Sequence, residues 1–167
     1  MSHHEHRPEA PTRLRLAVVT FSDTRGEADD VSGRALRDGF AAAGHEVVRY
    51  ALSREEPAAI RTALQEALAA GVDAVVSNGG TGLTSRDGTI EIAGELIAKP
   101  LPGFGELFRL LSFQQIGAAA MLSRACAGLT RDRRLLLCLP GSTAAVTLAL
   151  HRLLLPELPH LVREARR

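Results

Sequence analysis

Short apolar segments alternate with segments of helical periodicity along this chain, and this alternation constrains its fold more than any other feature. The apolar segments are rich in valine and leucine and at most eight residues long, as is typical of buried strands. We expect strands over four of them: 14–21, 46–52, 73–77 and 135–139. Apolar residues at helical spacing predict helices between and after them: 32–43, 57–70, 89–98, 105–111 and from 143 to about 155. The chain is therefore expected to form an α/β domain with a mainly parallel, buried central sheet.

Glycine and proline residues mark the expected ends of several helices. Gly44 and Gly71 follow the first two helical segments, where glycine commonly ends a helix, and Pro57 opens the second. Pro156 is expected to break the long helix before a short basic helix at the C-terminus.

The length of 167 residues suits a single domain, which we expect over residues 13–167. Residues 1–12 are expected to be a disordered tail, because the first eleven are polar and lack the apolar segment of a signal peptide. The histidines of this tail are expected to be solvated: His3, His4 and His6. No segment approaches the ~18 apolar residues of a membrane span. These features predict a cytoplasmic protein with no membrane partner.

The charge balance argues against a nucleic-acid partner. Twenty basic and nineteen acidic side chains give a formal charge of +1, so no basic surface is indicated. Aromatic residues, on which unpaired bases stack, make up only 4% of the chain. Lys99 is the single lysine, so lysine-dependent phosphate binding or Schiff-base chemistry has one candidate.

Cysteine and histidine residues give no metal-binding pattern. Cys126 and Cys138 lie among apolar residues, and reduced thiols in the core explain them better than a metal site or a catalytic role does. His45, His151 and His160 are scattered without ligand spacing, so a zinc site is not predicted.

Small or polar loops follow three of the expected strands directly. They are Ser22-Asp23, the segment 78–82 and Pro140-Gly141-Ser142. Ligands of open α/β sheets bind outside the carboxyl ends of the strands. Each loop alone could be ordinary turn chemistry, but the three together predict a binding site at one edge of the sheet.

The second of these loops reads GGTGLTSRDGT over residues 79–89. Glycines between a strand and a helix let backbone N–H groups approach an anionic ligand. The segment matches neither a Walker A loop nor the dinucleotide fingerprint. Arg86 and Asp87 would supply charge neutralisation and a magnesium ligand. Asp87 could instead cap the next helix, and the residues alone do not decide between these two roles.

This loop strongly resembles the signature of the MogA/MoaB family of molybdenum cofactor biosynthesis proteins, which also occurs in the gephyrin G domain. The likeness extends over residues 14–158 and continues in further segments: 18–23, 30–36, 102–106, 122–124 and 139–143. The segments 108–117 and Leu139-Pro140-Gly141-Ser142-Thr143 are more similar to the MoaB branch than to MogA.

The resemblance implies a three-layer α/β/α, molybdopterin-binding (MogA-like) fold and a molybdopterin adenylyltransferase activity. Such proteins bind the substrates molybdopterin and ATP, with Mg²⁺ as cofactor. They transfer AMP to the terminal phosphate of the pterin and release pyrophosphate. Positioning and charge stabilisation do most of the work in such a reaction. A non-catalytic molybdopterin- or nucleotide-binding protein of the MoaB type is the alternative, and a generic nucleotide-binding module is a third.

The resemblance also implies the residues of the site. Nucleotide phosphate would contact residues of the three loops: Gly79, Gly80, Thr81, Gly82, Ser22, Asp23, Pro140, Gly141 and Ser142. Molybdopterin would contact a second group: Ser112, Ser123, Arg124 and Glu106. Glu106 could also form a surface ion pair with Arg109. Asp87 matches the catalytic acid of the family and would hold Mg²⁺.

The sequence departs from the family at the second acidic residue of the site. That residue usually follows the second strand in a Val-Pro-Asp context, whereas this chain has Leu52-Ser53-Arg54-Glu55-Glu56. Glu55 is the nearest match and the expected second Mg²⁺ ligand, with Glu56 as the alternative. The extra methylene group of glutamate would move the carboxylate by ~1.5 Å, and a misplacement of ~1 Å can cost about a hundredfold in rate.

The resemblance implies a homo-oligomer as well. Trimers are usual in the family, and the MoaB branch resembles a dimer of trimers. Adenylylated molybdopterin is the substrate for molybdate insertion, so the molybdate-insertion protein is an implied partner.

Overall fold

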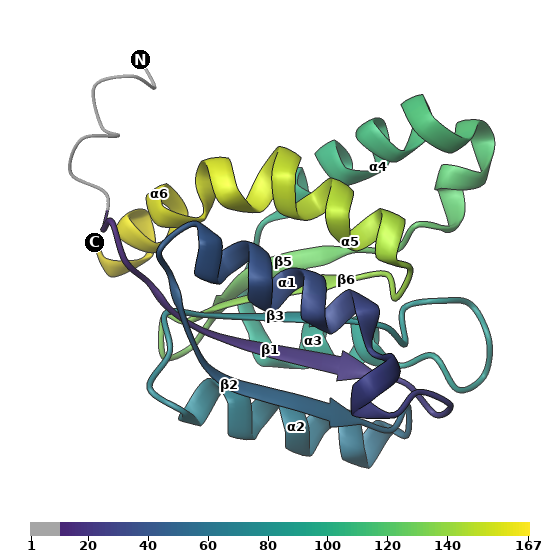
Figure 1. Cartoon of the computed structure of the whole chain (residues 1–167), viewed down its shortest axis with the longest axis horizontal. Coiled ribbons are helices and arrows are strands. Elements are labelled where there is room, and N and C mark those ends of the chain that lie inside the picture. Colours follow the sequence, from purple (N-terminus) through teal and green to yellow (C-terminus); the bar gives the residue numbers. More distant parts are fainter. Residues whose placement is uncertain (1–10) are drawn as a thin grey trace.

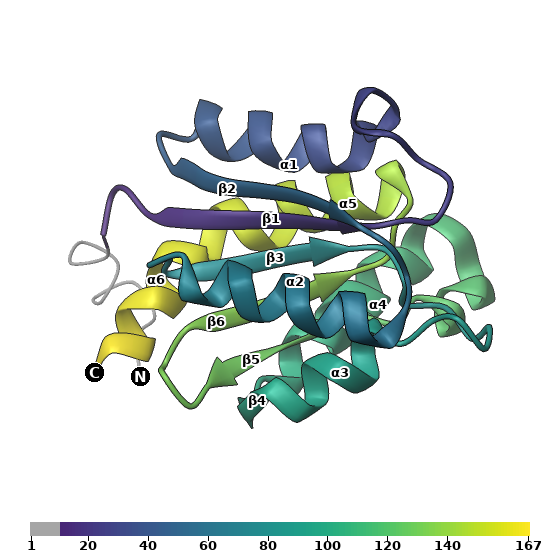
Figure 2. The same cartoon turned by 90° about the horizontal axis from the view of Figure 1, so that it is seen from below.

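Within residues 11–167, which the computed structural model describes, six strands form one sheet in the order β2-β1-β3-β6-β5-β4 (Figure 1, Figure 2). Their bounds are β1 Arg15–Phe21, β2 Glu46–Ser53, β3 Ala74–Asn78, β4 Ile97–Pro100, β5 Cys126–Thr130 and β6 Leu135–Leu139. The strands β2, β1, β3 and β6 are parallel, whereas β5 and β4 run antiparallel to their neighbours. Most of the tail expected over residues 1–12, with its three histidines, lies outside the described residues.

Helices cover both faces of the sheet and give three layers (Figure 1). Their bounds are α1 Val31–Ala42, α2 Pro57–Ala69, α3 Thr89–Leu96, α4 Pro102–Ile116, α5 Thr143–Ala149 and α6 Leu155–Arg166. Shorter helical segments are η2 Glu27–Asp29, η3 Gly117–Leu122 and the π-helical turn η4 Leu150–Leu154. The three-layer α/β fold that the sequence predicts is confirmed.

Alternating side chains of the strands build two separate cores. Leu16 and Val18 of β1 pack with α1, α4, α5 and α6, whereas Ala17 and Val19 pack with α2 and α3. Because successive residues of a strand point to opposite faces, a strand covered on both sides must be apolar throughout. This explains the apolar segments 16–19 of β1, 74–76 of β3 and 135–139 of β6, all of which are buried. None of the helices over residues 11–167 is both long and apolar enough to cross a bilayer.

The path of the chain creates a topological switch point between β1 and β3. From β1 the chain passes through α1 to β2 on one side, and then through α2 to β3 on the other side of β1. The loops that leave β1 and β3 therefore turn away from each other at the carboxyl ends of adjacent strands. Switch points of this kind are the usual ligand sites of open α/β sheets.

Two strands escape the sequence prediction. Residues 97 and 98 were expected within a helix, but α3 ends at Leu96 and the chain continues as β4. Within the described residues β4 is an edge strand that pairs with β5, and it contains Lys99 and Pro100, residues that protect edge strands from further pairing. Strand β5 contains Gly128, where a Cβ atom would lie 2.4 Å from Cγ2 of Ile97. The same Cβ atom would lie 2.6 Å from the backbone oxygen of Lys99, so close packing against β4, rather than strand propensity, places Gly128 in the sheet.

Two predicted helix boundaries are also wrong. The helix expected over 105–111 extends over Pro102–Ile116, because Pro102 occupies its first turn, where no N–H donor is required. The break expected at Pro156 does not occur, since Pro156 likewise lies in the first turn of α6, directly after the π-helical turn η4. The glycine stops are confirmed, with φ angles of 85° at Gly44 and 69° at Gly71.

Candidate functional site

A cavity of about 390 Å³ opens at the carboxyl ends of the parallel strands. Its lining comes from the loops after β1, β2, β3 and β6 and from the end of η3: Phe21, Ser22, Thr24, Arg25, Glu55, Gly79, Gly80, Thr81, Gly82, Asp87, Leu122, Pro140 and Gly141. The predicted gathering of three loops at one edge is thus confirmed. Another hollow of about 370 Å³ lies between α2 and the β5–β6 turn, but no strand-end glycine loop lines it.

Three of the four residues with which the glycine loop after β3 first lines this cavity are glycines: Gly79, Gly80 and Gly82. Gly79 and Gly80 have φ angles of 94° and 64°, which favour glycine. A Cβ atom on Gly79 would lie 2.1 Å from the carbonyl oxygen of Phe21, so no side chain fits there. Thr89 anchors the loop to the start of α3, because its Oγ1 donates to Gly79 O and its backbone N–H donates to Gly80 O, both at 3.0 Å. The loop is therefore a fixed backbone cradle.

Asp87 closes the far end of the glycine loop. One of its carboxylate oxygens accepts hydrogen bonds from the backbone N–H and the hydroxyl of Thr84, at 2.9 and 2.5 Å. Burial raises the pKa of Asp87, but these bonds, a backbone bond at Gly82 and the charge of Arg124 hold it below its ordinary value. Gly88 is the N-cap residue of α3, and the carboxylate of Asp87 bonds to Thr84 instead, so the helix-capping alternative for Asp87 is wrong.

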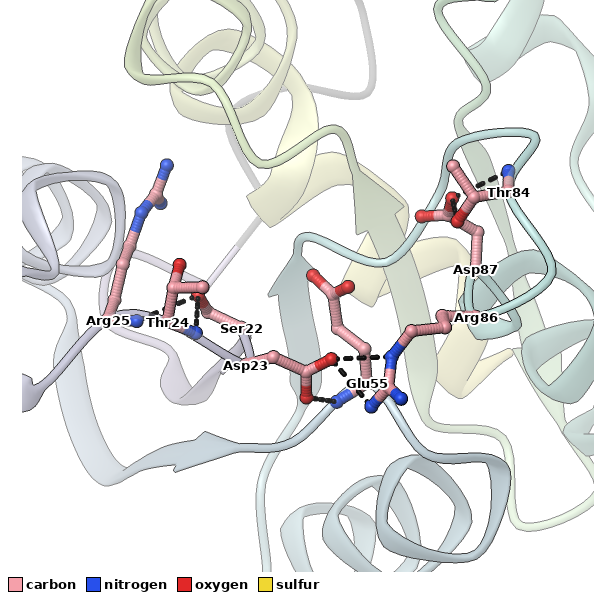
Figure 3. A network of polar contacts seen from close by, with 8 residues as sticks. All are labelled: Ser22, Asp23, Thr24, Arg25, Glu55, Thr84, Arg86 and Asp87. Atoms are coloured by element: carbon pink, nitrogen blue, oxygen red, sulfur yellow. Dashed lines mark hydrogen bonds and ion pairs between the residues drawn. The ribbon is translucent and has the colours of Figure 1, made fainter.

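Glu55 extends from the end of β2 into the same cavity (Figure 3). Burial, followed by the negative charges of Asp23 and Asp87, raises the pKa of Glu55 above its ordinary value. Carboxylates that face one cavity are groups that could hold a cation. Glu56, the alternative ligand, is exposed, does not line the cavity, and is the N-cap residue of α2.

Asp23 joins the loops that carry these two carboxylates. Its Oδ1 accepts from the backbone N–H of Glu55 at 3.1 Å, and its Oδ2 accepts from Nε of Arg86 at 2.7 Å (Figure 3). Ser22 supports the start of the same loop, since its Oγ accepts from the backbone N–H groups of Thr24 and Arg25. Asp23 is thus bonded to its neighbours and is not itself among the residues that line the cavity.

The loop after β6 packs directly on the glycine loop. A Cβ atom on Gly141 would lie 3.1 Å from Cα of Gly79, so the two backbones are in close contact. The carbonyl oxygen of Gly141 accepts from Nη1 of Arg25 at 3.1 Å and from Oγ of Ser32 at 2.9 Å. Ser142 is exposed and caps α5, because its Oγ accepts from the backbone N–H of Ala145 at 3.2 Å.

The residues matched to molybdopterin binding are distributed differently. Arg124 donates to the carbonyl oxygen of Gly82 at 3.0 Å and pairs with Glu91, so it braces the glycine loop. Ser123 follows Leu122, which lines the cavity. Ser112 is only 4% exposed and its Oγ donates to the carbonyl oxygen of Phe108 at 2.8 Å, within α4. Glu106 is exposed on α4, and neither it nor Ser112 lines the cavity of the single chain.

Sequence reasoning missed two cavity residues with polar side chains, Thr24 and Arg25. Both follow Ser22-Asp23 without interruption, so the position of the segment after a buried strand was the available signal. The hydrogen bond from Arg25 to Gly141 spans 116 positions of the sequence and has no local signature. Among residues 11–167, no three His, Cys, Asp or Glu side chains lie together as a metal-binding group. The cavity therefore offers a metal two carboxylates, Glu55 and Asp87.

Comparison with known proteins gives consistent results. A family model described as "Probable molybdopterin binding domain" matches residues 17–160. Molybdenum cofactor biosynthesis protein B of Halalkalibacterium halodurans is 47% identical over 166 residues, which cover 98% of this chain and 97% of that protein. The tungsten cofactor synthesizing protein MoaB from Pyrococcus furiosus superposes with a TM-score of 0.87 at 37% identity, over 95% of this chain and all of that one. A structure of MogA, 25% identical, superposes with a TM-score of 0.81 over 90% of this chain and 99% of that one. The chain thus belongs to the MogA/MoaB family of molybdenum cofactor biosynthesis proteins.

Proposed function

We propose that this protein binds molybdopterin and ATP in the strand-end cavity and transfers AMP to the terminal phosphate of the pterin. One observation carries the proposal: the glycine-rich loop and two carboxylates, Glu55 and Asp87, line the same cavity. The matched domain is described as molybdopterin-binding, and the curated relatives are named as molybdenum cofactor biosynthesis proteins. Both descriptions support molybdopterin as the ligand and cofactor biosynthesis as the role.

The phosphate groups of the ligands would lie against the glycine loop. Backbone N–H groups bind phosphate oxygens without a lysine, which suits a chain whose single lysine, Lys99, lies on the edge strand β4. Arg25 is one of the lining residues and would supply positive charge. Arg124 would act through the glycine loop, since its guanidinium already bonds to Gly82 and Glu91.

The donor set fits Mg²⁺. Magnesium in nucleotide sites is commonly held by one or two carboxylates, with water and phosphate oxygens completing six ligands. Glu55 and Asp87 provide two carboxylates, and their mutual repulsion favours a cation between them. A Cβ atom on Gly82 would lie 2.8 Å from Oδ2 of Asp87, so the glycine leaves this carboxylate accessible. A bound Mg²⁺ would neutralise phosphate charge during the transfer.

In the proposed reaction, a terminal phosphate oxygen of molybdopterin attacks the α-phosphorus of ATP. A new phosphorus–oxygen bond forms, the bond from the α-phosphorus to the bridging oxygen of the β-phosphate breaks, and pyrophosphate leaves. The protein would contribute position and charge rather than a covalent bond, with the strand-end loops holding the two phosphate groups in line. The adenylylated pterin would then pass to the molybdate-insertion protein.

Glutamate at position 55 supports a second candidate, in which the protein binds molybdopterin or its nucleotide without turnover. The side chain of Glu55 is one methylene group longer than that of the aspartate usual in the family. A metal ligand displaced in this way would lower the rate more than the affinity. The two candidates share the cavity and differ only in turnover.

An assay of the pure protein with molybdopterin, ATP and Mg²⁺ distinguishes the candidates. We expect pyrophosphate and adenylylated pterin, and we expect Asp87→Asn to abolish both while the fold is retained, because asparagine keeps an oxygen acceptor for Thr84. Glu56→Gln is the matched control outside the cavity and should leave the rate unchanged. Pterin binding without any product in the wild type would support the second candidate, and full turnover by Asp87→Asn would refute the metal-ligand role.

We also propose that the protein forms a homo-oligomer, a trimer or a dimer of trimers, through α4. A stripe of large apolar side chains on this helix is 52–59% exposed: Leu107, Leu110, Phe113 and Ile116. Met121 and Leu122 of η3 continue it with exposures of 80% and 62%. Contiguous exposed apolar surface of this kind marks protein interfaces, and a second copy of the chain is the occupant that the family implies.

A further inference from the structure

Cys126 and Cys138 lie directly opposite each other on neighbouring antiparallel strands, β5 and β6. Side chains at directly paired positions of such strands project from the same face of the sheet. The Cα atoms of paired residues are ~4.5–5.5 Å apart, which lies within the ~4.4–6.8 Å range of disulfide-bonded cysteines. The two sulfur atoms can therefore be joined without a change in strand register.

The two thiols differ in their access to solvent. Cys138 is fully buried in the core beneath α2 and α3, whereas Cys126 is only partly buried at its edge. A small oxidant from solvent would therefore meet Cys126 first. Cys138 is held behind it, in position to react with whatever forms on Cys126.

Hydrogen bonding between the two thiols shifts their pKa values in opposite directions. The bond with Cys138 lowers the pKa of Cys126, and the positive charge of Arg124 lowers it further against the effect of burial. The pKa of Cys138 is raised by the same bond and by its complete burial. The thiolate, which is the reactive form, is thus favoured on the accessible member of the pair.

We propose that Cys126 and Cys138 are an oxidative modification site, at which a hydroperoxide converts the reduced pair into an intramolecular disulfide. The thiolate sulfur of Cys126 attacks one oxygen of hydrogen peroxide, the O–O bond breaks, hydroxide leaves, and Cys126 becomes a sulfenic acid. The sulfur of Cys138 then attacks the sulfur of Cys126, the S–O bond breaks, and the oxygen leaves as water with the proton of Cys138. In total, two thiols and one peroxide give one disulfide and two waters.

The position of the pair connects it to the strand-end cavity. Cys126 lies two residues after Arg124, whose side chain donates to Gly82 of the glycine loop. Cys138 lies two residues before Pro140, which lines the cavity. The disulfide would therefore tie together the two strands that support one wall of the cavity. The inference depends on the geometry of these strands and not on the proposed adenylyl transfer.

Thiol alkylation of the full-length protein tests the proposal. Alkylation is carried out in denaturant, because Cys138 is buried in the folded protein. We expect two alkylated cysteines before treatment with a few equivalents of hydrogen peroxide, none after it, and two again after reduction with dithiothreitol. The linked peptides should be ~2 Da lighter than the sum of the separate ones, the mass of two hydrogen atoms. The masses of the separate peptides must be measured, because peroxide can also oxidise the exposed side chain of Met121 and so change the mass of the whole protein.

Single variants assign the roles of the two thiols. Cys138→Ala removes the second thiol, so Cys126 should accumulate as a sulfenic acid that dimedone traps. Cys126→Ala leaves only the buried thiol, which should react at least ~10-fold more slowly than Cys126 does in the wild type. The proposal is refuted if Cys138 stays free in the wild type after the Cys126 thiol has been lost completely. It is also refuted if the disulfide forms only between two chains. The wild-type measurement stands alone if either variant fails to fold.

Discussion

The guanidinium group of Arg86 contacts the carboxylate of Asp23 at 2.7 Å, although 63 positions separate the two residues in the sequence. Arg86 belongs to the glycine loop after β3 and Asp23 to the loop after β1 (Figure 3). The other oxygen of Asp23 binds the backbone N–H of Glu55. One ion pair therefore fixes the spacing between the two strand-end loops and, through Asp23, the position of Glu55.

We expect Arg86→Ala to weaken Mg-ATP binding at least ~10-fold, because misplacement of site groups by ~1 Å is costly. The same change should lower the free energy of unfolding by only about 1 kcal/mol or less, since the side chain of Arg86 is 55% exposed. Calorimetric titration and urea denaturation measure the two effects.

Arg61→Ala provides the matched control for this prediction. It removes a comparable exposed ion pair, with Glu95 at 2.7 Å, that lies on α2 and α3 away from the cavity. Equal losses of ATP affinity in the two variants would contradict a specific role for the pair of Arg86 and Asp23.

Gly79→Ala is expected to destabilise the fold by more than about 2 kcal/mol, because it combines a left-handed φ of 94° with a Cβ atom 2.1 Å from Phe21 O. Gly94→Ala should have the opposite effect. Gly94 lies inside α3 with no atom within 4 Å of an added Cβ, so alanine should stabilise the protein by about 0.5–1 kcal/mol. Chemical denaturation of both variants checks the contrast, and equal effects would show that the loop can relax.

Glu55→Gln is expected to stabilise the metal-free protein in a pH-dependent way. The folded protein raises the pKa of Glu55, so it favours the protonated form more than the unfolded chain does. Below the ordinary glutamate pKa both states are protonated and the variant should match the wild type. As the pH rises through the folded-state pKa, the wild type must hold a carboxylate beside Asp23 and Asp87, and its relative stability should fall.

Thermal denaturation at about pH 4.5, close to the ordinary glutamate pKa, and at about pH 8, well above it, measures this difference. Addition of Mg²⁺ at the higher pH should raise the melting temperature of the wild type more than that of Glu55→Gln, since the variant would keep Asp87 but lose the second proposed carboxylate ligand. A difference in stability that is independent of pH would contradict the electrostatic explanation.

Tyr50→Phe should destabilise the loop before α1 by about 1–3 kcal/mol. The hydroxyl of Tyr50 donates to Oδ2 of Asp30 at 2.7 Å, and Asp30 is fully buried while its Oδ1 caps α1 through Gly33 N. Burial and the bond to Asp30 raise the pKa of Tyr50, so this donor keeps its proton at all ordinary pH values. Urea denaturation at neutral pH measures the loss, and an unchanged midpoint would show that water replaces the phenol.

Leu110→Asp is expected to dissociate the proposed oligomer. Leu110 lies within the exposed apolar stripe of α4 and is 55% exposed in the single chain, so the charge is tolerated in a monomer but not in an apolar interface. Light scattering after size-exclusion chromatography should give a multiple of three chains for the wild type and a lower mass for the variant. A monomeric wild type at micromolar concentration would refute the proposed interface.

Periodic segments of the sequence were sufficient to predict the parallel part of the sheet and the strand-end site. Val18 and Val19 illustrate why. They are buried on opposite faces of the sheet, so two successive apolar residues indicate a strand that is covered on both sides. Strand β5 could not be found in this way, because Gly128 is dictated by the close approach of Ile97, a contact between distant segments. The bracing bonds of Arg25 and Arg124 are invisible for the same reason.

The divergence of the chain after β1 and β3 has a consequence for how such a protein can change over time. The opening between these strands exists because the backbone departs to opposite sides, and not because small side chains leave a hole in the core. Substitutions of exposed side chains in the strand-end loops can therefore alter which ligand is accommodated while the two packed cores stay intact, whereas Gly79, whose backbone conformation excludes a side chain, cannot vary in this way. New specificities are thus expected to arise at the exposed loop positions, where a substitution puts little of the folding energy at risk.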